Sequence, residues 1–171
     1  MNLTRRALLL AGLWPVPAAL AQAPAEARLK ARLALTLARF TQWPSGSFAS
    51  PGEPLLLCAL HHSETVQVAF AELTGQTVNG HPVRVVDGSA PAGCHVLFVH
   101  ESAWRAGLPL PIPSTPTLTI GDAEGFASRG GMIELVNFND ALRFDVHLGL
   151  LRGAQLDLSS RALQLARRVK D

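Results

Sequence analysis

The chain has 171 residues, with 15 lysines and arginines, 13 aspartates and glutamates, and a hydrophobic fraction of 48%. This length suits one domain with a sizeable core. The nearly balanced charge argues against nucleic-acid binding, because phosphate recognition requires a basic face, and against electrostatic attachment to a membrane surface.

Residues 1–21 have the organisation of an export signal. Arg5 and Arg6 form a positive n-region, a short apolar run follows, and a small-x-small triplet ends at Ala21. Two prolines interrupt the apolar run, which is too short for a transmembrane span. We therefore predict cleavage after Ala21, by the general secretory or the twin-arginine route, and a soluble periplasmic domain of residues 22–171. Loss of Arg5 and Arg6 lowers the basic count from 15 to 13, equal to the acidic count, so the mature chain is formally neutral.

Apolar periodicity in the first half of the mature chain predicts helices that alternate with buried strands. A helix over 27–40 is indicated because Leu29, Leu33 and Leu37 recur at helical spacing. The continuous apolar runs that follow are typical of strands buried on both faces. The predicted order after the first helix is a strand at 54–60, a helix at 65–73, strands at 83–86 and 95–99, a short helix at 102–106 and a strand at 117–120.

The second half predicts one helical turn, a hairpin and two more helices. The hairpin is indicated by Asn139-Asp140 between two apolar segments. These elements are expected at 126–129, at 132–138 with 141–146, at 148–152, and from a cap at Ser159 or Ser160 to Val169. The whole pattern predicts an α/β fold, a single-domain sandwich with a largely parallel sheet, a late antiparallel hairpin and flanking helices.

The two cysteines, Cys58 and Cys94, form an even pair, and an oxidising compartment favours a disulfide between them. Such a bridge would stabilise the fold by about 3–4 kcal/mol in the chain-entropy model. Two buried thiols are the alternative, because pairing requires Cα atoms within about 7 Å.

No motif for nucleotide, metal or nucleophilic chemistry is present in the sequence. His61-His62 follows the first buried strand where a G-x-G-x-x-G loop would be needed. Adjacent residues of a strand point to opposite faces, and no further ligands stand at metal-binding spacing. There is no G-x-S-x-G elbow, and the acids Asp122 and Glu124 lie in a turn. We expect no enzymatic activity, no metal and no cofactor.

Four segments, read in order, carry a family resemblance. They are LARFTQWP at 37–44; LLLCAL at 55–60, then LTGQTVNGHP at 73–82; AGCHVLFV at 92–99; and LTIGDAEGFASRGGMI at 118–133, continuing to 142–146 and 158–167. Together they resemble the YfiR family of periplasmic proteins, and the resemblance spans nearly the whole mature chain.

The resemblance implies a regulatory protein. YfiR-like proteins bind the periplasmic sensor part of an inner-membrane diguanylate cyclase and hold it inactive. An outer-membrane lipoprotein of the OmpA-like type sequesters the repressor, so that cyclic di-GMP rises and favours biofilm formation. The resemblance also implies an α/β sandwich that often dimerises, and Cys58 and Cys94 fall where the family's inter-strand bridge is expected.

Two departures from the family pattern leave partner choice and small-ligand binding open. Leu35-Thr36-Leu37 stands where members often carry Tyr-Asn-Phe, and His147 stands where they often have Asn. Two other functions therefore remain as alternatives, a periplasmic small-ligand-binding protein and an exported hydrolase with a cryptic site.

The end of the first helix is the predicted partner-binding surface. Trp43 and Phe40 are the main candidates, because large rigid side chains are enriched among interface hot spots. Phe40 also lies on the apolar stripe of the helix, so a core role is its alternative. Arg129, beside two glycines, and His147 are further candidates, and His147 would make the contact sensitive to pH near neutrality.

Overall fold

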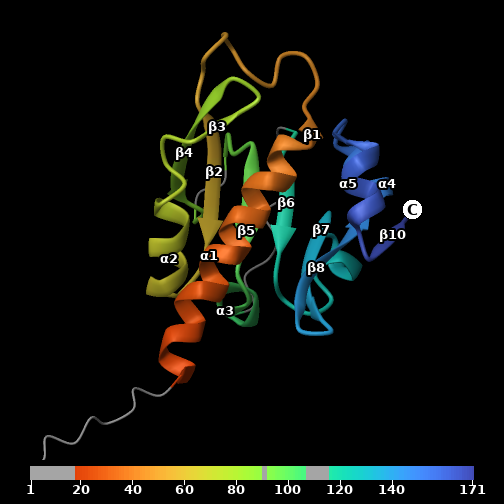
Figure 1. Cartoon of the computed structure of the whole chain (residues 1–171). Helices are drawn as coiled ribbons and strands as arrows, with labels where there is room; N and C mark the ends of the chain where they lie inside the picture. Colours follow the sequence, from red (N-terminus) through yellow and green to blue (C-terminus); the bar gives the residue numbers. More distant parts are fainter. Residues whose placement is uncertain (1–17, 90–91, 107–115) are drawn as a thin grey trace, which may run out of the picture.

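A largely parallel sheet runs through the centre of the molecule (Figure 1). The computed structural model describes residues 18–89, 92–106 and 116–171, so the predicted signal, residues 1–21, lies mostly outside the described part. Within the described residues the sheet has eight strands. In spatial order they are β10 (Arg168–Lys170), β8 (Ala141–His147), β7 (Ile133–Phe138), β6 (Leu118–Gly121), β5 (Val96–Val99), β2 (Leu55–Leu60), β4 (His81–Asp87) and β3 (Thr77–Val78).

The pairing confirms the predicted α/β architecture. Strand β2 pairs parallel with both β4 and β5, and the parallel order continues through β6 to β7. The β7–β8 hairpin is antiparallel, and Asn139 and Asp140 in its turn have φ of 51° and 57°, the left-handed conformation that tight hairpins require. Strand β2 therefore lies in the interior of the sheet, with β5 on one side and β4 on the other.

Helices cover both faces of the sheet. Helices α1 and α2 pack together on one face, and the short elements α3 and η1 lie on the other. A separate two-stranded antiparallel pair, β1 with β9, joins the end of α1 to the C-terminal region. The bounds are α1 (Ala18–Arg39), α2 (Glu64–Ala71), α3 (Glu101–Arg105), η1 (Ala127–Arg129), α4 (Leu148–Gly153), α5 (Ser160–Leu165), β1 (Thr41–Gln42) and β9 (Asp157–Leu158).

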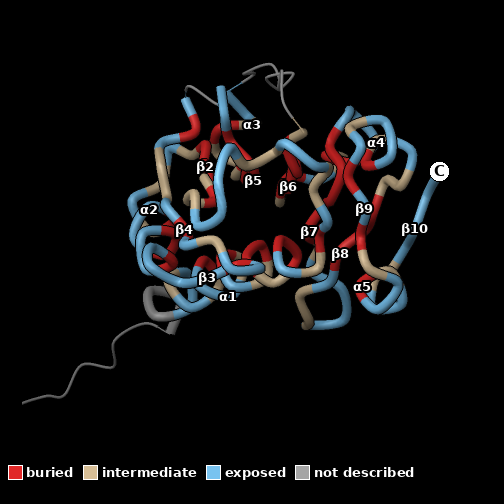
Figure 2. Tube along the Cα trace, turned by 90° about the horizontal axis from the view of Figure 1, so that it is seen from above, coloured by how far each residue is buried: buried red, intermediate tan, exposed pale blue. Residues whose placement is uncertain are grey.

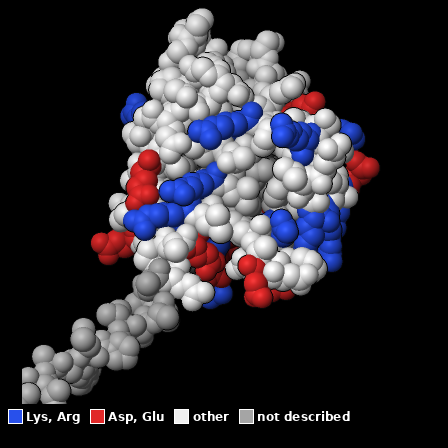
Figure 3. Space-filling model, viewed as in Figure 1, with Lys and Arg blue, Asp and Glu red and all other residues white. Residues whose placement is uncertain are grey.

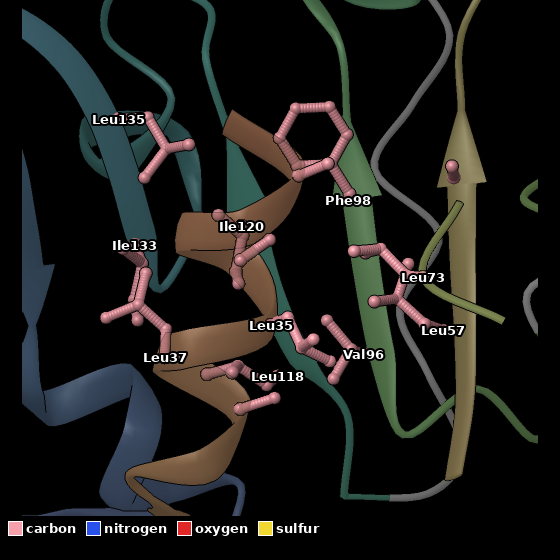
Figure 4. Packing of buried hydrophobic residues seen from close by; sticks show 14 of the residues in the cluster. Leu35, Leu37, Leu57, Leu73, Val96, Phe98, Leu118, Ile120, Ile133 and Leu135 are labelled. Carbon is pink, nitrogen blue, oxygen red and sulfur yellow. The ribbon is translucent and has the colours of Figure 1, made fainter. Parts of the chain in front are cut away.

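The core has a larger and a smaller part, one on each face of the sheet. Leu55 and Leu57 of β2 face the larger cluster under α1 and α2, whereas Cys58 and Leu60 face the smaller cluster under α3. This alternation explains why β2 reads as a continuous apolar run. Figure 2 shows burial concentrated in the central strands, and Figure 4 shows side chains of α1 meeting those of the strands in the larger cluster.

Helix α1 begins earlier than predicted, and its buried face coincides only in part with the predicted stripe. Within that stripe, Leu37 is buried and Leu33 packs against the larger cluster, but Leu29 is 52% exposed. Alanines outside the stripe, among them Ala31 and Ala34, are also buried. Small side chains let the helix lie close to the strands. On the outer surface of α1, basic side chains follow one another along the helix (Figure 3). Arg28 of this helix pairs with Glu72, with 3.0 Å between Nε and Oε1. No described helix, α1 included, is long and apolar enough to cross a membrane.

The predicted last helix is wrong in its second half. Helix α5 ends at Leu165, and the chain then extends into β10, parallel to β8. Arg167 accounts for the change, because its backbone N–H donates to Phe144 O at 2.8 Å and its Nε donates to Asp145 at 2.8 Å. Ser159 is the helix cap, as predicted.

Candidate interaction site

Cys58 and Cys94 are joined by a disulfide, with Cα atoms 5.9 Å apart. Cys58 lies in β2 and Cys94 just before β5, so the bridge links neighbouring parallel strands. Both residues are almost fully buried in the smaller cluster. The bridge predicted in preference to two thiols is thus present, and its role is structural.

Trp43 belongs to an aromatic cluster at the amino-terminal end of the parallel strands. Its ring meets Phe48 edge-on at 6.2 Å between centroids. Phe48 is stacked between two imidazoles, His81 at 3.7 Å and His95 at 4.3 Å. The turn-rich segment after α1 is therefore held at this end of the sheet by stacked rings, and half-buried Trp43 packs against the edge of Phe48, beside the stack.

Hydrogen bonds fix both imidazoles of the cluster. His95 Nδ1 accepts from Leu56 N at 3.0 Å, and its Nε2 lies 2.9 Å from Ser47 O, so the proton of the neutral ring is on Nε2. His81 Nδ1 lies 2.8 Å from Glu53 O and carries the proton there. Each imidazole is therefore held in place by hydrogen bonding as well as by its stacking on Phe48.

A cleft of about 420 Å³ opens beside Trp43. Trp43, Phe48 and His81 contribute to its wall, with Asn79 and residues of β1. The indole nitrogen of Trp43 is buried and has no hydrogen-bond partner within the described residues. A buried donor without a partner carries a free-energy cost, and because this nitrogen is enclosed, it is the partly exposed ring of Trp43 that a partner can reach.

Phe40, the other predicted contact at this end, is half-buried and packs against the larger core cluster. Its carbonyl accepts the N–H of Ser159 at 2.9 Å, which ties the end of α1 to the cap of α5. The structure therefore gives Phe40 a packing role in addition to its partial exposure.

Arg129 stands on the opposite face of the sheet. Its guanidinium lies 4.5 Å above the ring of Trp104, and its Nη2 donates to Glu124 O at 2.9 Å. Trp104 in turn meets the fully buried Phe126 edge-on at 5.4 Å. A stacked, hydrogen-bonded arginine beside a half-buried tryptophan is preorganised, as interface hot spots commonly are.

His147 caps helix α4. Its Nδ1 accepts from Leu150 N at 3.4 Å, and its own N–H donates to Met132 O at 2.8 Å. Because β8 runs antiparallel to its neighbour, His147 lies at the same end of the sheet as Trp43. The candidates therefore occupy two regions, Trp43, Phe40 and His147 at the amino-terminal ends of the parallel strands, and Arg129 beside α3.

A buried polar cluster at the carboxyl ends of the strands was not predicted. The Asp122 side chain is 1% exposed, and its Oδ2 lies 2.9 Å from Lys30 Nζ and 3.6 Å from His100 Nε2. Asp122 Oδ1 also accepts from Glu101 N at 2.7 Å. His61, His100 and Asp122 directly follow β2, β5 and β6. Polar residues placed after buried parallel strands gather at one edge of the sheet. This placement is the sequence signal from which the cluster could have been predicted.

Burial and charge shift the pKa values in this cluster in opposite directions. Burial lowers the pKa of His100, and the nearby Asp122 carboxylate opposes this without reversing it. Burial also lowers the pKa of His61. For Lys30, burial works against the charged form, but hydrogen bonds to Glu26 and Asp122 outweigh it and raise the pKa. Near neutral pH the cluster therefore holds a charged Lys30 beside an uncharged His100.

Among the described residues, no group of three or more histidines, cysteines, aspartates and glutamates is arranged to hold a metal ion.

A comparison with protein families matches residues 27–167 to the family described as YfiR/HmsC-like. The chain belongs to the YfiR/HmsC-like family. The resemblance predicted from the four ordered segments is confirmed, and membership points to a regulatory protein rather than to an enzyme. No curated protein matches the chain.

Proposed function

We propose that this YfiR/HmsC-like protein is a periplasmic regulator that binds the sensor region of an inner-membrane diguanylate cyclase and holds the enzyme inactive. The observation that carries the proposal is the family match over residues 27–167. The export pattern of residues 1–21 supports the periplasmic location. The regulator lowers cyclic di-GMP and biofilm formation, and an outer-membrane OmpA-like lipoprotein relieves the repression by sequestering it.

Two surfaces are suited to the cyclase contact. The first is the partly exposed ring of Trp43 beside an open cleft. The second is the Trp104–Arg129 stack. Both present a partly exposed tryptophan ring, a side chain that is enriched at the centres of protein interfaces.

Affinity capture from membranes, followed by mass spectrometry, tests the partner class. A captured protein with a membrane-anchored cyclase domain supports the proposal. Repeated capture that yields no such protein, from cells that express one with a periplasmic domain, contradicts it.

Quantitative binding to the purified periplasmic domain of that cyclase then tests the two surfaces. Trp43→Ala and Arg129→Ala should each weaken binding by about 2 kcal/mol or more, roughly 30-fold, if they are hot spots. Arg105→Ala is the matched control, because Arg105 is an exposed arginine of α3 whose ion pair within the described part of the chain is with Glu101. Normal binding by either variant, with an unchanged thermal melt, would remove that surface from the proposal.

The cleft beside Trp43 favours a second candidate function, small-ligand binding in the periplasm. Its volume, about 420 Å³, falls in the range of small-molecule sites. Native mass spectrometry of protein purified from the periplasm provides the test. A bound molecule present in the wild type and absent in Trp43→Ala would support this function, and a ligand-free wild-type spectrum would count against it.

A further inference from the structure

Helix α3 depends on the side chain of His100, which caps it. His100 Nδ1 accepts the backbone N–H of Ser102 at 3.3 Å and lies 2.8 Å from Ser102 Oγ. A backbone N–H can only donate, so Nδ1 must carry its lone pair and the proton of the neutral ring must be on Nε2. The hydroxyl of Ser102 then donates to the same nitrogen, and the cap exists only while His100 is uncharged.

Ser102 extends this dependence to a second strand end. Its Oγ accepts the backbone N–H of His62 at 2.9 Å. The first turn of α3 is thereby tied to the segment after β2, in addition to its position after β5. If Ser102 moves away from His100 Nδ1, both the helix cap and the hydrogen bond to the backbone of His62 are therefore weakened.

The groups around His100 show how the ring would respond to protonation at Nδ1. Nε2 faces Asp122 Oδ2 at 3.6 Å, and the same oxygen holds Lys30 Nζ at 2.9 Å. The other titratable groups near His100 are Glu26 of α1, which pairs with Lys30 at 2.8 Å, and Glu101 of α3. His61, which follows β2, also interacts electrostatically with His100. The imidazolium would be drawn toward Asp122 and would compete there with Lys30, while its new Nδ1–H would face the N–H of Ser102.

The short helix α3 transmits this change to a candidate interaction surface. It has five residues, too few to persist through its own backbone hydrogen bonds, so its cap has a large influence. Trp104 lies in this helix, its N–H donates to His100 O at 3.1 Å, and its ring carries the guanidinium of Arg129. Loss of the cap therefore releases the residue on which Arg129 is stacked.

We propose that His100 is a proton switch in which protonation uncaps α3 and loosens the Trp104–Arg129 surface, so that partner binding through this surface weakens as the periplasm acidifies. The part that concerns partner binding rests on the proposed function, whereas the switch itself is a property of the free protein. The observations that carry it are the two hydrogen bonds accepted by Nδ1 and the facing Asp122 carboxylate.

The switch is tested by NMR titration of the mature protein from about pH 7.5 to about pH 5. The backbone amide of Ser102 and the indole N–H of Trp104 should shift together with one midpoint. His100→Asn should abolish the titration at both positions, because an asparagine oxygen caps a helix well and carries no proton. His62→Asn is the matched control, since the neighbouring His62 is exposed and contributes only its backbone N–H, and it should titrate like the wild type.

Signals of Ser102 and Trp104 that stay constant in the wild type would overturn the switch, and so would a titration that persists in His100→Asn. Cyclase binding measured over the same pH range forms the second arm. Wild-type affinity should fall by about fivefold on acidification, the factor that corresponds to one helix cap, and His100→Asn should remain constant. A switch seen by NMR with pH-independent binding would disprove the role of this surface in partner contact and would leave the proposed function to its own test.

Discussion

Phe126 is the residue around which the smaller core cluster is built. It is fully buried, its ring supports Trp104, and two glycines lie directly against it. A Cβ added at Gly121 would stand 2.5 Å from the Phe126 ring, and one added at Gly131 would overlap the ring on its other edge. These glycines are therefore needed for space at Phe126.

Gly131→Ala should destabilise the protein by about 1–3 kcal/mol, because the added methyl must displace an enclosed aromatic ring. The change should also disturb Trp104 and Arg129, which rest on that ring. Chemical denaturation of both proteins measures the difference in unfolding free energy.

Gly153→Ala is the control for this prediction. A Cβ at Gly153 would meet nothing within 4 Å, and the residue lies in helix α4. Alanine should be neutral or slightly stabilising at that position. If Gly131→Ala were equally neutral, Phe126 would have room to move, and the close packing described here would not be a constraint.

At the scale of elements, the disulfide joins β2 to the start of β5. Cys58 and Cys94 are 36 positions apart in the sequence, and the segment between them contains α2 and the strands β3 and β4 at one edge of the sheet. The bridge thus closes a loop that contains one helix and two strands, and it belongs to the same smaller core cluster as Phe126.

Cys94→Ser should lower the unfolding free energy by about 2–5 kcal/mol, the usual range for a structural bridge in a small exported domain. Thermal melts of the variant and of the wild type, each with and without a reductant, measure the effect. The reductant should lower the melting temperature of the wild type and leave the variant unchanged. A wild type that is insensitive to full reduction would show that the cysteines contribute only as buried side chains.

Local pattern was sufficient to predict the elements that depend on burial. The strand at 54–60 and the hairpin around Asn139-Asp140 were recognisable because buried strands read as continuous apolar runs and because tight turns need particular residues. Helix α5 was overextended because Leu165 and Val169 continue a helical spacing, whereas Arg167 leaves the helix to pair with Asp145, a contact remote in sequence.

The candidate interaction residues were likewise predictable only in part from the local sequence. The exposure of Arg129 followed from its glycine-rich surroundings, but its stacking on Trp104 depends on two segments that only the fold brings together. The buried face of α1 was predicted only in part, because Leu37 faces the core as expected, whereas Leu29 is exposed and alanines also take part in the close packing on the sheet. Sequence periodicity finds the helix and does not show how closely it must approach its neighbour.

At the scale of the whole molecule, the polar cluster at the carboxyl ends of the strands connects the two faces. Lys30 comes from α1 on one face, while His100 precedes α3 on the other, and both reach Asp122. The charges of this cluster are buried and paired, so breaking one partnership would leave an uncompensated charge. Global stability should therefore respond to the protonation of its members.

The unfolding free energy should fall as the pH drops from about 7 to about 5. Burial lowers the pKa values of His61 and His100 in the folded protein, so in this range the unfolded chain binds more protons than the folded one, and acid favours unfolding. Lys30 has a raised pKa, and its contribution is lost only when the pH rises into the alkaline range. Glu26, whose hydrogen bond to Lys30 lowers its pKa, loses its contribution only below the ordinary carboxyl range.

Denaturant titrations at several pH values measure the slope of the unfolding free energy against pH. The double change His61→Asn with His100→Asn should reduce this slope, while His62→Asn, at an exposed position, should leave it unchanged. A slope that survives the double change would assign the acid sensitivity to groups outside the cluster.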